Sequence, residues 1–243
     1  MIAFVSDAHI EGEEEEIQAF LEFLDSLKGS AQTLYILGDL FNLWLGSPKM
    51  GMPYQEPIVQ ALRQLAASGT AVKYVEGNRD YYLSERYLGS PFREIGSSYL
   101  EALIGGKKFY LSHGDLVNRH DKPYQYWRKF SRNRVFYTAF NLLPFQGGLS
   151  LATYLEKKFR GTNRKHKSYF PMETCKEFAE SLFDRGYDRI ILGHFHQERI
   201  LSFKRGRSEK LLYILPDWKT QRKMLQVDAE GEGKFVKTAG GRQ

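Results

Sequence analysis

Three times in the first eighty residues, a short apolar run ends in polar side chains, and this repeated ending constrains the fold more than any other feature of the sequence. The runs cover residues 2–5, 33–37 and 71–75, and residues 13–27 and 56–67 between them carry apolar side chains at helical spacing. Strands that alternate with helices in this way predict parallel neighbouring strands. Because the carboxyl ends of parallel strands meet at one edge of a sheet, we expect the polar side chains there to form a site.

The second half of the chain repeats the pattern with histidines. Residues 99–103 and 107–111 flank a glycine pair and predict a hairpin, whose second strand leads into His113. A further strand at 188–192 leads into a His-x-His motif at 194–196. The remaining regular stretches predict one helix at 174–183 and a meander of strands at 199–203, 210–215, 224–227 and 234–236.

Five strand ends therefore carry oxygen and nitrogen donors, although each motif alone occurs often by chance. A single histidine at a strand end is more often structural than a ligand, but the set as a whole suits two divalent ions that share one carboxylate. Mixed imidazole, amide and carboxylate donors favour Mn, Fe, Zn or Co over Ca. Asp80 and Asp115 are expected to orient the ligands. The seven candidate ligands are Asp7, His9, Asp39, Asn78, His113, His194 and His196.

This ordered set resembles the calcineurin-like metallophosphoesterases, from residue 2 to about residue 218. The resemblance implies an α/β fold built as a β-sandwich flanked by helices, whereas the strand pattern alone also allows an open α/β sheet. Two metal ions, expected to be Mn²⁺, would activate a water molecule and neutralise charge on the attacked phosphate. The resemblance implies one ion at Asp7, His9 and His196, another at Asn78, His113 and His194, Asp39 as their bridge, and catalytic roles for Asp39, Asn78, Arg79 and His194.

Arg79 limits which leaving groups the site is expected to release. Most members of the broad family have a sequence like Gly-Asn-His-Asp at the position where this chain has Gly77-Asn78-Arg79-Asp80. An arginine stays protonated at neutral pH, so it cannot give its proton to a leaving group, although it can clamp a phosphate. A leaving group that needs no such help is a phosphate monoester released from a pyrophosphate.

The same motifs resemble the UDP-2,3-diacylglucosamine hydrolases of lipid A synthesis. Those enzymes cleave a pyrophosphate on its UMP side and release UMP and a lipid monosaccharide 1-phosphate. Two alternatives remain open: a phosphoesterase for another nucleotide diphosphate or a phosphodiester, and a catalytically silent scaffold that binds proteins. The full ligand set argues against the scaffold, which would not need it.

Residues 122–170 form an insertion that is both apolar and basic, with eleven Lys or Arg residues and one acidic residue, Glu156. We expect a helical lid with an apolar inner face for acyl chains and a basic outer face, including Arg128 and Arg132, for anionic lipid headgroups. A packed helical subdomain with solvated basic residues is the alternative. The resemblance implies that Asp121, Asn163, Arg164 and Lys167 contact the substrate, and we expect Arg79 and two aromatic residues of the insertion, Tyr124 and Trp127, to bind it as well.

The remaining expectations concern organisation and compartment. We expect a single domain over residues 1–243, and the lone cysteine, Cys175, excludes an internal disulfide and a multi-cysteine zinc site. No apolar run approaches the roughly 20 residues of a membrane span. We expect a cytoplasmic monomer that meets the inner membrane surface through the insertion and binds a lipid-linked UDP-sugar. Nucleic acid is not an expected partner, because the aromatic residues recur at helical spacing and favour internal packing over base stacking.

Overall fold

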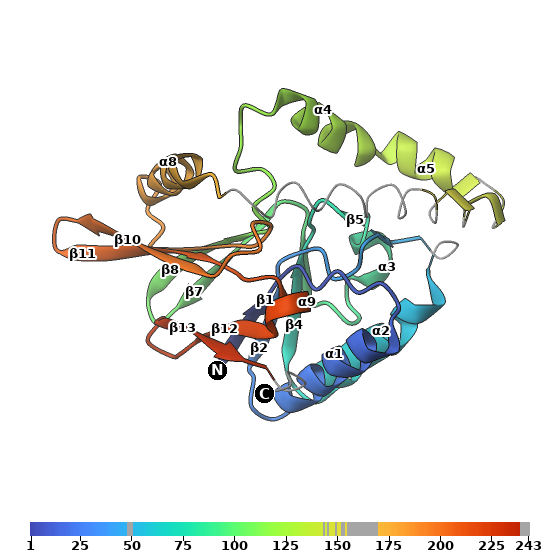
Figure 1. The fold of residues 1–243 in the computed structure, drawn as a ribbon, viewed down its shortest axis with the longest axis horizontal. Coiled ribbons are helices and arrows are strands. Elements are labelled where there is room, and N and C mark those ends of the chain that lie inside the picture. The colour runs from blue at the N-terminus through green and yellow to red at the C-terminus, as the bar shows by residue number, and fades with distance from the viewer. Residues whose placement is uncertain are drawn as a thin grey trace.

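The fold is a sandwich of two β-sheets with helices on both outer faces (Figure 1). The computed structural model describes residues 1–47, 51–142, 144, 146–148, 150, 151, 154 and 170–238. One sheet has six strands in the order β13-β12-β1-β2-β4-β6, and the other has five in the order β10-β11-β9-β8-β7. The bounds are β1 (Ile2–Val5), β2 (Thr33–Ile36), β4 (Ala71–Val75), β6 (Glu94–Gly96), β7 (Tyr99–Ile104), β8 (Lys107–Ser112), β9 (Arg189–Leu192), β10 (Arg199–Arg205), β11 (Ser208–Ile214), β12 (Lys223–Val227) and β13 (Gly233–Lys237).

Each sheet has a parallel centre, and the parallel strands end at the site. In the first sheet β1, β2, β4 and β6 are parallel neighbours, and in the second sheet β8, β9 and β11 are. The predicted four-strand meander is wrong in one respect. The β10–β11 hairpin joins the second sheet, whereas β12 crosses to the first sheet and pairs antiparallel with β1.

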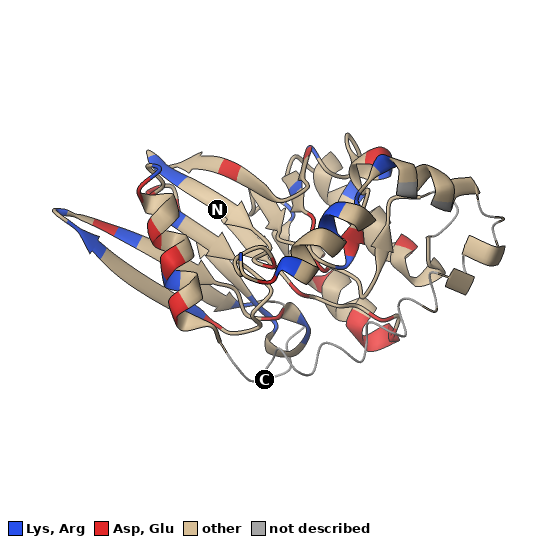
Figure 2. Cartoon of the chain, turned by 90° about the horizontal axis from the view of Figure 1, so that it is seen from above, with Lys and Arg blue, Asp and Glu red and all other residues tan. Residues whose placement is uncertain are grey.

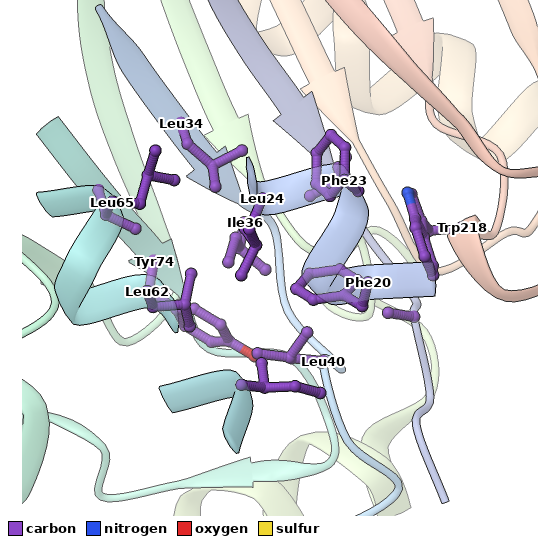
Figure 3. Close-up of a cluster of buried hydrophobic side chains, with 14 of the residues drawn as sticks. Phe20, Phe23, Leu24, Leu34, Ile36, Leu40, Leu62, Leu65, Tyr74 and Trp218 are labelled. Atoms are coloured by element: carbon purple, nitrogen blue, oxygen red, sulfur yellow. The ribbon is translucent and has the colours of Figure 1, made fainter. Parts of the chain in front are cut away.

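Side chains that alternate along the strands build separate cores on the two faces of each sheet. Phe4 and Tyr35 lie between the sheets, while their neighbours Leu34 and Ile36 face the helices. On that outer face, α1 (Glu14–Leu27) and α2 (Glu56–Ala67) pack against the sheet, as Figure 3 shows for Phe20, Leu62 and their neighbours. The outer face of the second sheet is covered by α8 (Met172–Phe183). Burial on both faces explains why the strands are apolar runs rather than alternating ones.

The insertion begins with α4 (Lys122–Ser131) and α5 (Arg134–Leu142), which lie across the molecule above the carboxyl ends of the strands (Figure 1). Beneath them is a parallel pair that was not predicted, β3 (Trp44–Leu45) and β5 (Asp80–Tyr81). Three further short elements in the described part of the chain are the 3-10 turn η1 (Pro53–Gln55), α3 (Ser84–Tyr87) and α9 (Trp218–Gln221). Among the described residues, none of the helices combines the length and the apolar character that crossing a bilayer requires.

Candidate metal centre

The loops that follow β1, β2 and β9 are joined to one another directly. The backbone N–H of Asp7 donates to Gly38 O at 3.1 Å, and that of His9 donates to Asp39 O at 3.0 Å. From the second sheet, the N–H of His194 donates to Asp7 Oδ2 at 2.8 Å. These bonds hold the strand ends of both sheets in one place, so the candidate ligands form a single cluster.

One half of the cluster is centred on Asp7. Its Oδ1 lies 3.5 Å from His9 Nε2 and 3.3 Å from His196 Nε2, and the two imidazole rings stack with centroids 5.2 Å apart. The ligand atoms of these three residues all lie within 4.8 Å of one another, which is the spacing of a shared cation site.

The other half is centred on His113. Its Nε2 lies 3.6 Å from Asp39 Oδ2, 3.0 Å from Asn78 Oδ1 and 3.3 Å from His194 Nδ1. Asp39 Oδ2 is also 4.0 Å from His9 Nε2, so this carboxylate faces both halves. Asp7 also belongs to the second half, because one ligand atom from each of Asp7, Asp39 and His113 lies within 4.8 Å of the other two.

The electrostatics of the cluster favour a cation. Burial acts to raise the pKa of Asp7, but His196 and His113 outweigh it and hold this pKa well below its usual range. Burial acts to lower the pKa of His113, but the Asp39 and Asp7 carboxylates raise it to about 9. For His194, burial and the charge on His113 lower the pKa to about 4. The carboxylates thus favour positive charge in the cluster, either as a proton on His113 or as a bound cation that replaces it, while His194 stays neutral, as a metal-binding imidazole must be.

Buried side-chain atoms without a hydrogen-bond partner also indicate a cation site. Within the described part of the chain, neither ring nitrogen of His9 and not Oδ1 of Asp7 has a hydrogen-bond partner, although all three atoms are buried. Buried polar atoms in native proteins normally have a partner. A divalent metal ion held by these residues would supply one, so the donor set fits a divalent metal ion.

The backbone at the cluster adopts a conformation that sequence reasoning missed. Five of the seven candidate ligands have positive φ angles: Asp7 (56°), His9 (42°), Asp39 (55°), His194 (70°) and His196 (57°). Non-glycine residues rarely occupy this region, and such strain concentrates at functional sites. Asp and His are enriched among the non-glycine residues that adopt positive φ, so the residue types carried a weak signal that could have indicated the conformation.

Two glycines next to the ligands allow the loops to approach closely. A Cβ on Gly77 would lie 2.2 Å from Asp39 Oδ1, and a Cβ on Gly193 would lie 2.0 Å from Ser6 Oγ and 2.9 Å from Asp7 Oδ2. Any side chain at either position would therefore displace a carboxylate of the cluster.

Comparison with known proteins agrees with this geometry. The profile of the calcineurin-like phosphoesterase family matches residues 1–198. The chain belongs to this family. It is therefore a metal-dependent hydrolase, and the predicted sandwich flanked by helices is confirmed.

Curated relatives of this phosphoesterase cover nearly its whole length. It is 32% identical over 232 residues to a UDP-2,3-diacylglucosamine hydrolase of Pseudomonas putida, spanning 95% of this chain and 96% of the relative. It is 33% identical over 236 residues to an enzyme of the same name from Pseudomonas fluorescens, spanning 95% and 93%. Vacuolar protein sorting 29 from Cryptosporidium parvum has a similar structure at a TM-score of 0.46 and 16% identity, covering 97% of this chain and 94% of that one, which is too distant to indicate function.

Asp80 lies beneath the metal cluster of the phosphoesterase. One of its oxygens, Oδ2, accepts hydrogen bonds from the N–H groups of Gly77 (2.8 Å) and Asp39 (2.9 Å) and from the hydroxyl of Tyr74 (2.9 Å). Complete burial, with Asp39 nearby, raises the pKa of Asp80 to about 7. These contacts match the orienting role that we expect for Asp80.

Asp115 is held by the insertion. Its Oδ2 accepts hydrogen bonds from the hydroxyl of Tyr124 and from the guanidinium of Arg128, both on α4. Burial acts to raise the pKa of Asp115, but Arg128 and His113 hold it below its usual value. The carboxylate therefore links α4 to the loop that carries His113.

The structure places the predicted substrate-binding residues unevenly. Arg79 is buried at 4% exposure, and its backbone N–H donates to Asp39 Oδ1 at 2.9 Å. Asp121 caps the amino end of α4 by accepting from Tyr124 N at 3.0 Å, while the side chain of Trp127 is 45% exposed. Three further candidates, Asn163, Arg164 and Lys167, lie outside the described residues.

The expectation that Arg128 and Arg132 lie on a basic outer face is wrong. Both turn toward the protein, where Arg128 pairs with Asp115 and Arg132 donates to backbone carbonyls of the loop after β4. The outward surface of α4 instead exposes Tyr126 and Phe130 together with Lys129. Figure 2 shows basic residues on α4, and acidic residues gathered on α8.

Proposed function

We propose that this phosphoesterase hydrolyses the pyrophosphate of UDP-2,3-diacylglucosamine to UMP and 2,3-diacylglucosamine 1-phosphate, lipid X, in lipid A biosynthesis. The observation that carries the proposal is Arg79, a buried arginine next to the candidate ligand Asn78. Most members of the broad family have a histidine at this position. The names of relatives that are 32–33% identical over 95% of the chain support the same substrate.

The metal ligands in this proposal are Asp7, His9 and His196 for one ion, and Asn78, His113 and His194 for the other. Asp39 would be shared by the two ions, which the distances from its Oδ2 to His9 (4.0 Å) and His113 (3.6 Å) support. Two divalent ions, Mn²⁺ in this proposal, supply an activated water and charge neutralisation.

The residues of the chain then orient the substrate for an in-line displacement. The guanidinium of Arg79 binds the pyrophosphate by charge-assisted hydrogen bonds, and its backbone N–H holds Asp39 in place. The water oxygen bonds to the phosphorus on the UMP side, and the bond from that phosphorus to the bridging oxygen breaks. The lipid sugar 1-phosphate leaves with the bridging oxygen and needs no proton from Arg79.

The insertion provides the acyl-chain site and contact with the inner membrane surface. On α4 and α5, the side chains of Trp127, Phe130, Val135 and Leu142 are 45%, 59%, 76% and 78% exposed. Such a concentration of exposed apolar side chains marks an interaction surface. Asp121, Tyr124, Trp127, Asn163, Arg164 and Lys167 complete the substrate site of a cytoplasmic, monomeric enzyme.

The experiment is a product assay in ¹⁸O-labelled water with purified protein and Mn²⁺. We expect UMP and lipid X in equal amounts, with the label in UMP. Asp39→Ala should abolish turnover and lower the bound Mn²⁺, whereas Asp25→Ala, which changes an exposed surface carboxylate, should change neither. Turnover of simple phosphodiesters without turnover of the lipid substrate would overturn the substrate assignment, and label in lipid X would overturn attack on the UMP side.

A further inference from the structure

Arg132 is a side chain of the insertion that reaches the metal centre without being one of its candidate ligands. Its Nη2 donates to Gly77 O at 2.5 Å and to Asp80 O at 2.9 Å. The guanidinium lies over the ring of Tyr81, 5.0 Å from its centroid, and Nε is 3.8 Å from Glu76 Oε2. With 14% of its side chain exposed, Arg132 is part of the packed structure and not of a solvated outer face.

The two carbonyl groups that Arg132 binds lie on either side of the candidate metal ligand Asn78 and the proposed phosphate-binding residue Arg79. Gly77 and Asp80 stand on either side of Asn78 and Arg79, so one guanidinium fixes both ends of the loop. On the opposite side, the loop is held by the Asp80 carboxylate, which accepts from the N–H of Gly77 and Asp39.

Glu76 sets the position of this guanidinium. It is a buried acid that the proposed chemistry does not use, and its Oε1 accepts from Leu83 N at 2.7 Å. Its other oxygen faces Arg132. A buried carboxylate needs a charge partner, so Glu76 and Arg132 stabilise each other where the insertion meets the loop.

Neighbouring contacts make α4 a rigid support for Arg132. Arg128, one turn earlier, binds Asp115 and also donates to Ser97 O at 2.6 Å. The hydroxyl of Tyr82 donates to the backbone carbonyl groups of Ser131 and Asn133 on either side of Arg132. The helix is therefore attached both to the loop of Asn78 and to the loop of His113.

We propose that Arg132 is a positioning residue that couples the insertion to the metal centre by holding the 77–80 loop, so that Asn78 faces the metal and Arg79 faces the phosphate. This inference rests on the proposed function only for the roles of Asn78 and Arg79. The insertion then orders the catalytic loop in addition to binding acyl chains. Removing residues 122–170 would damage the metal centre itself.

The variants are Arg132→Ala, which removes the guanidinium, and Arg132→Lys, which keeps the charge but has a single nitrogen, so it cannot face Glu76 with one nitrogen while it donates to the two carbonyl groups with another. The matched control is Arg134→Ala, because the Arg134 side chain is 90% exposed and, among the described residues, forms a surface pair with Glu85 at 3.7 Å. Thermal unfolding of each metal-free variant checks that the fold is kept.

The first two readouts need no substrate: Mn²⁺ affinity by titration calorimetry, and hydrogen exchange of the 77–80 amides in the metal-free protein. Groups that orient metal ligands typically contribute about 10- to 100-fold to metal affinity or activity. We expect a loss in this range for Arg132→Ala with faster exchange of the loop, a smaller loss for Arg132→Lys, and no change for Arg134→Ala.

The third readout is kcat with and without added methylguanidinium, which should restore part of the lost rate in Arg132→Ala and none in Asp39→Ala. Equal behaviour of Arg132→Ala and Arg134→Ala would overturn the inference. So would full wild-type behaviour of Arg132→Lys together with no recovery by methylguanidinium, since charge alone would then suffice. If the wild-type protein does not cleave the lipid substrate, the proposed function fails, while metal affinity and loop exchange still decide the role of Arg132.

Discussion

At the scale of single residues, the metal centre is a place where the backbone is held in costly conformations. Positive φ angles at Asp7, His9 and Asp39 cost of order 1–3 kcal/mol each. The surrounding hydrogen bonds keep them there, including those from Asp7 N and His9 N to the neighbouring loop. The orientation of the ligands is thus fixed by the backbone and its hydrogen bonds.

Gly77 gives a direct test of this close approach. In Gly77→Ala, the new Cβ would meet Asp39 Oδ1 at 2.2 Å, so the carboxylate or the loop must move. We expect Mn²⁺ affinity and turnover to fall at least tenfold, with a stability loss of about 1–3 kcal/mol, as is typical of overpacking. Calorimetric titration and urea unfolding measure the two effects. The control is Gly51→Ala, where the one described atom that the Cβ would meet is at the end of the Arg86 side chain, at 3.4 Å. Normal metal affinity in Gly77→Ala would show that the centre adapts easily.

Arg79 gives a test of the leaving-group chemistry. Arg79→His introduces the histidine that most members of the broad family have at this position. An imidazole can donate a proton near neutral pH. We expect the ratio of kcat/KM for the pyrophosphate substrate to kcat/KM for a simple phosphodiester to fall at least tenfold. Competition assays with both substrates measure that ratio. An unchanged ratio would mean that Arg79 does not select pyrophosphates.

At the scale of elements, α4 has a capping residue with two competing roles. Asp121 accepts from Tyr124 N, yet the resemblance to the hydrolases implies that it contacts substrate. Asp121→Ala should destabilise α4 by about 1 kcal/mol, whereas Asp121→Ser should keep the cap. The hydrogen-exchange rates of residues 122–131 measure the stability that the cap gives to α4. The KM measures the contact of Asp121 with the substrate. Equal exchange in the two variants would contradict the capping role, and a raised KM in Asp121→Ser with normal exchange would assign the carboxylate to substrate.

The elements also show what the sequence can predict. β1, α2 and β4 lie where hydrophobic periodicity places them, because each buries an apolar face against a neighbouring layer. The strand ends, and hence the candidate ligands, follow from these elements. The inward direction of Arg132 could not be predicted, since its partners are backbone carbonyl groups more than fifty residues away. The pairing of β3 with β5 is equally non-local and only two residues long.

At the scale of the whole molecule, the metal centre joins the two sheets. Asp7, Asp39 and Asn78 follow strands of the first sheet, whereas His113 and His194 follow strands of the second. Metal binding should therefore stabilise the whole fold. A metal ion at about 1,000 times its Kd adds about 4 kcal/mol per site.

For a chain of this size, each kcal/mol raises Tm by about 2–4 °C. Calorimetry of the protein with Mn²⁺ and with EDTA should show a Tm higher by at least about 8 °C with the metal. The shift should disappear in Asp39→Ala. Identical Tm values in Mn²⁺ and EDTA would mean that the folded protein does not bind the ion at these residues.

The place of β1 in the first sheet has a consequence for biosynthesis. β1 lies between β2 and β12, so β1 obtains one of its two partners only after residues 223–227 have been made. His194 and His196 also come late in the chain. Until then the nascent polypeptide has an open strand edge and an incomplete set of ligands, and such edges favour aggregation. The metal centre can therefore be completed only after these late segments have been made.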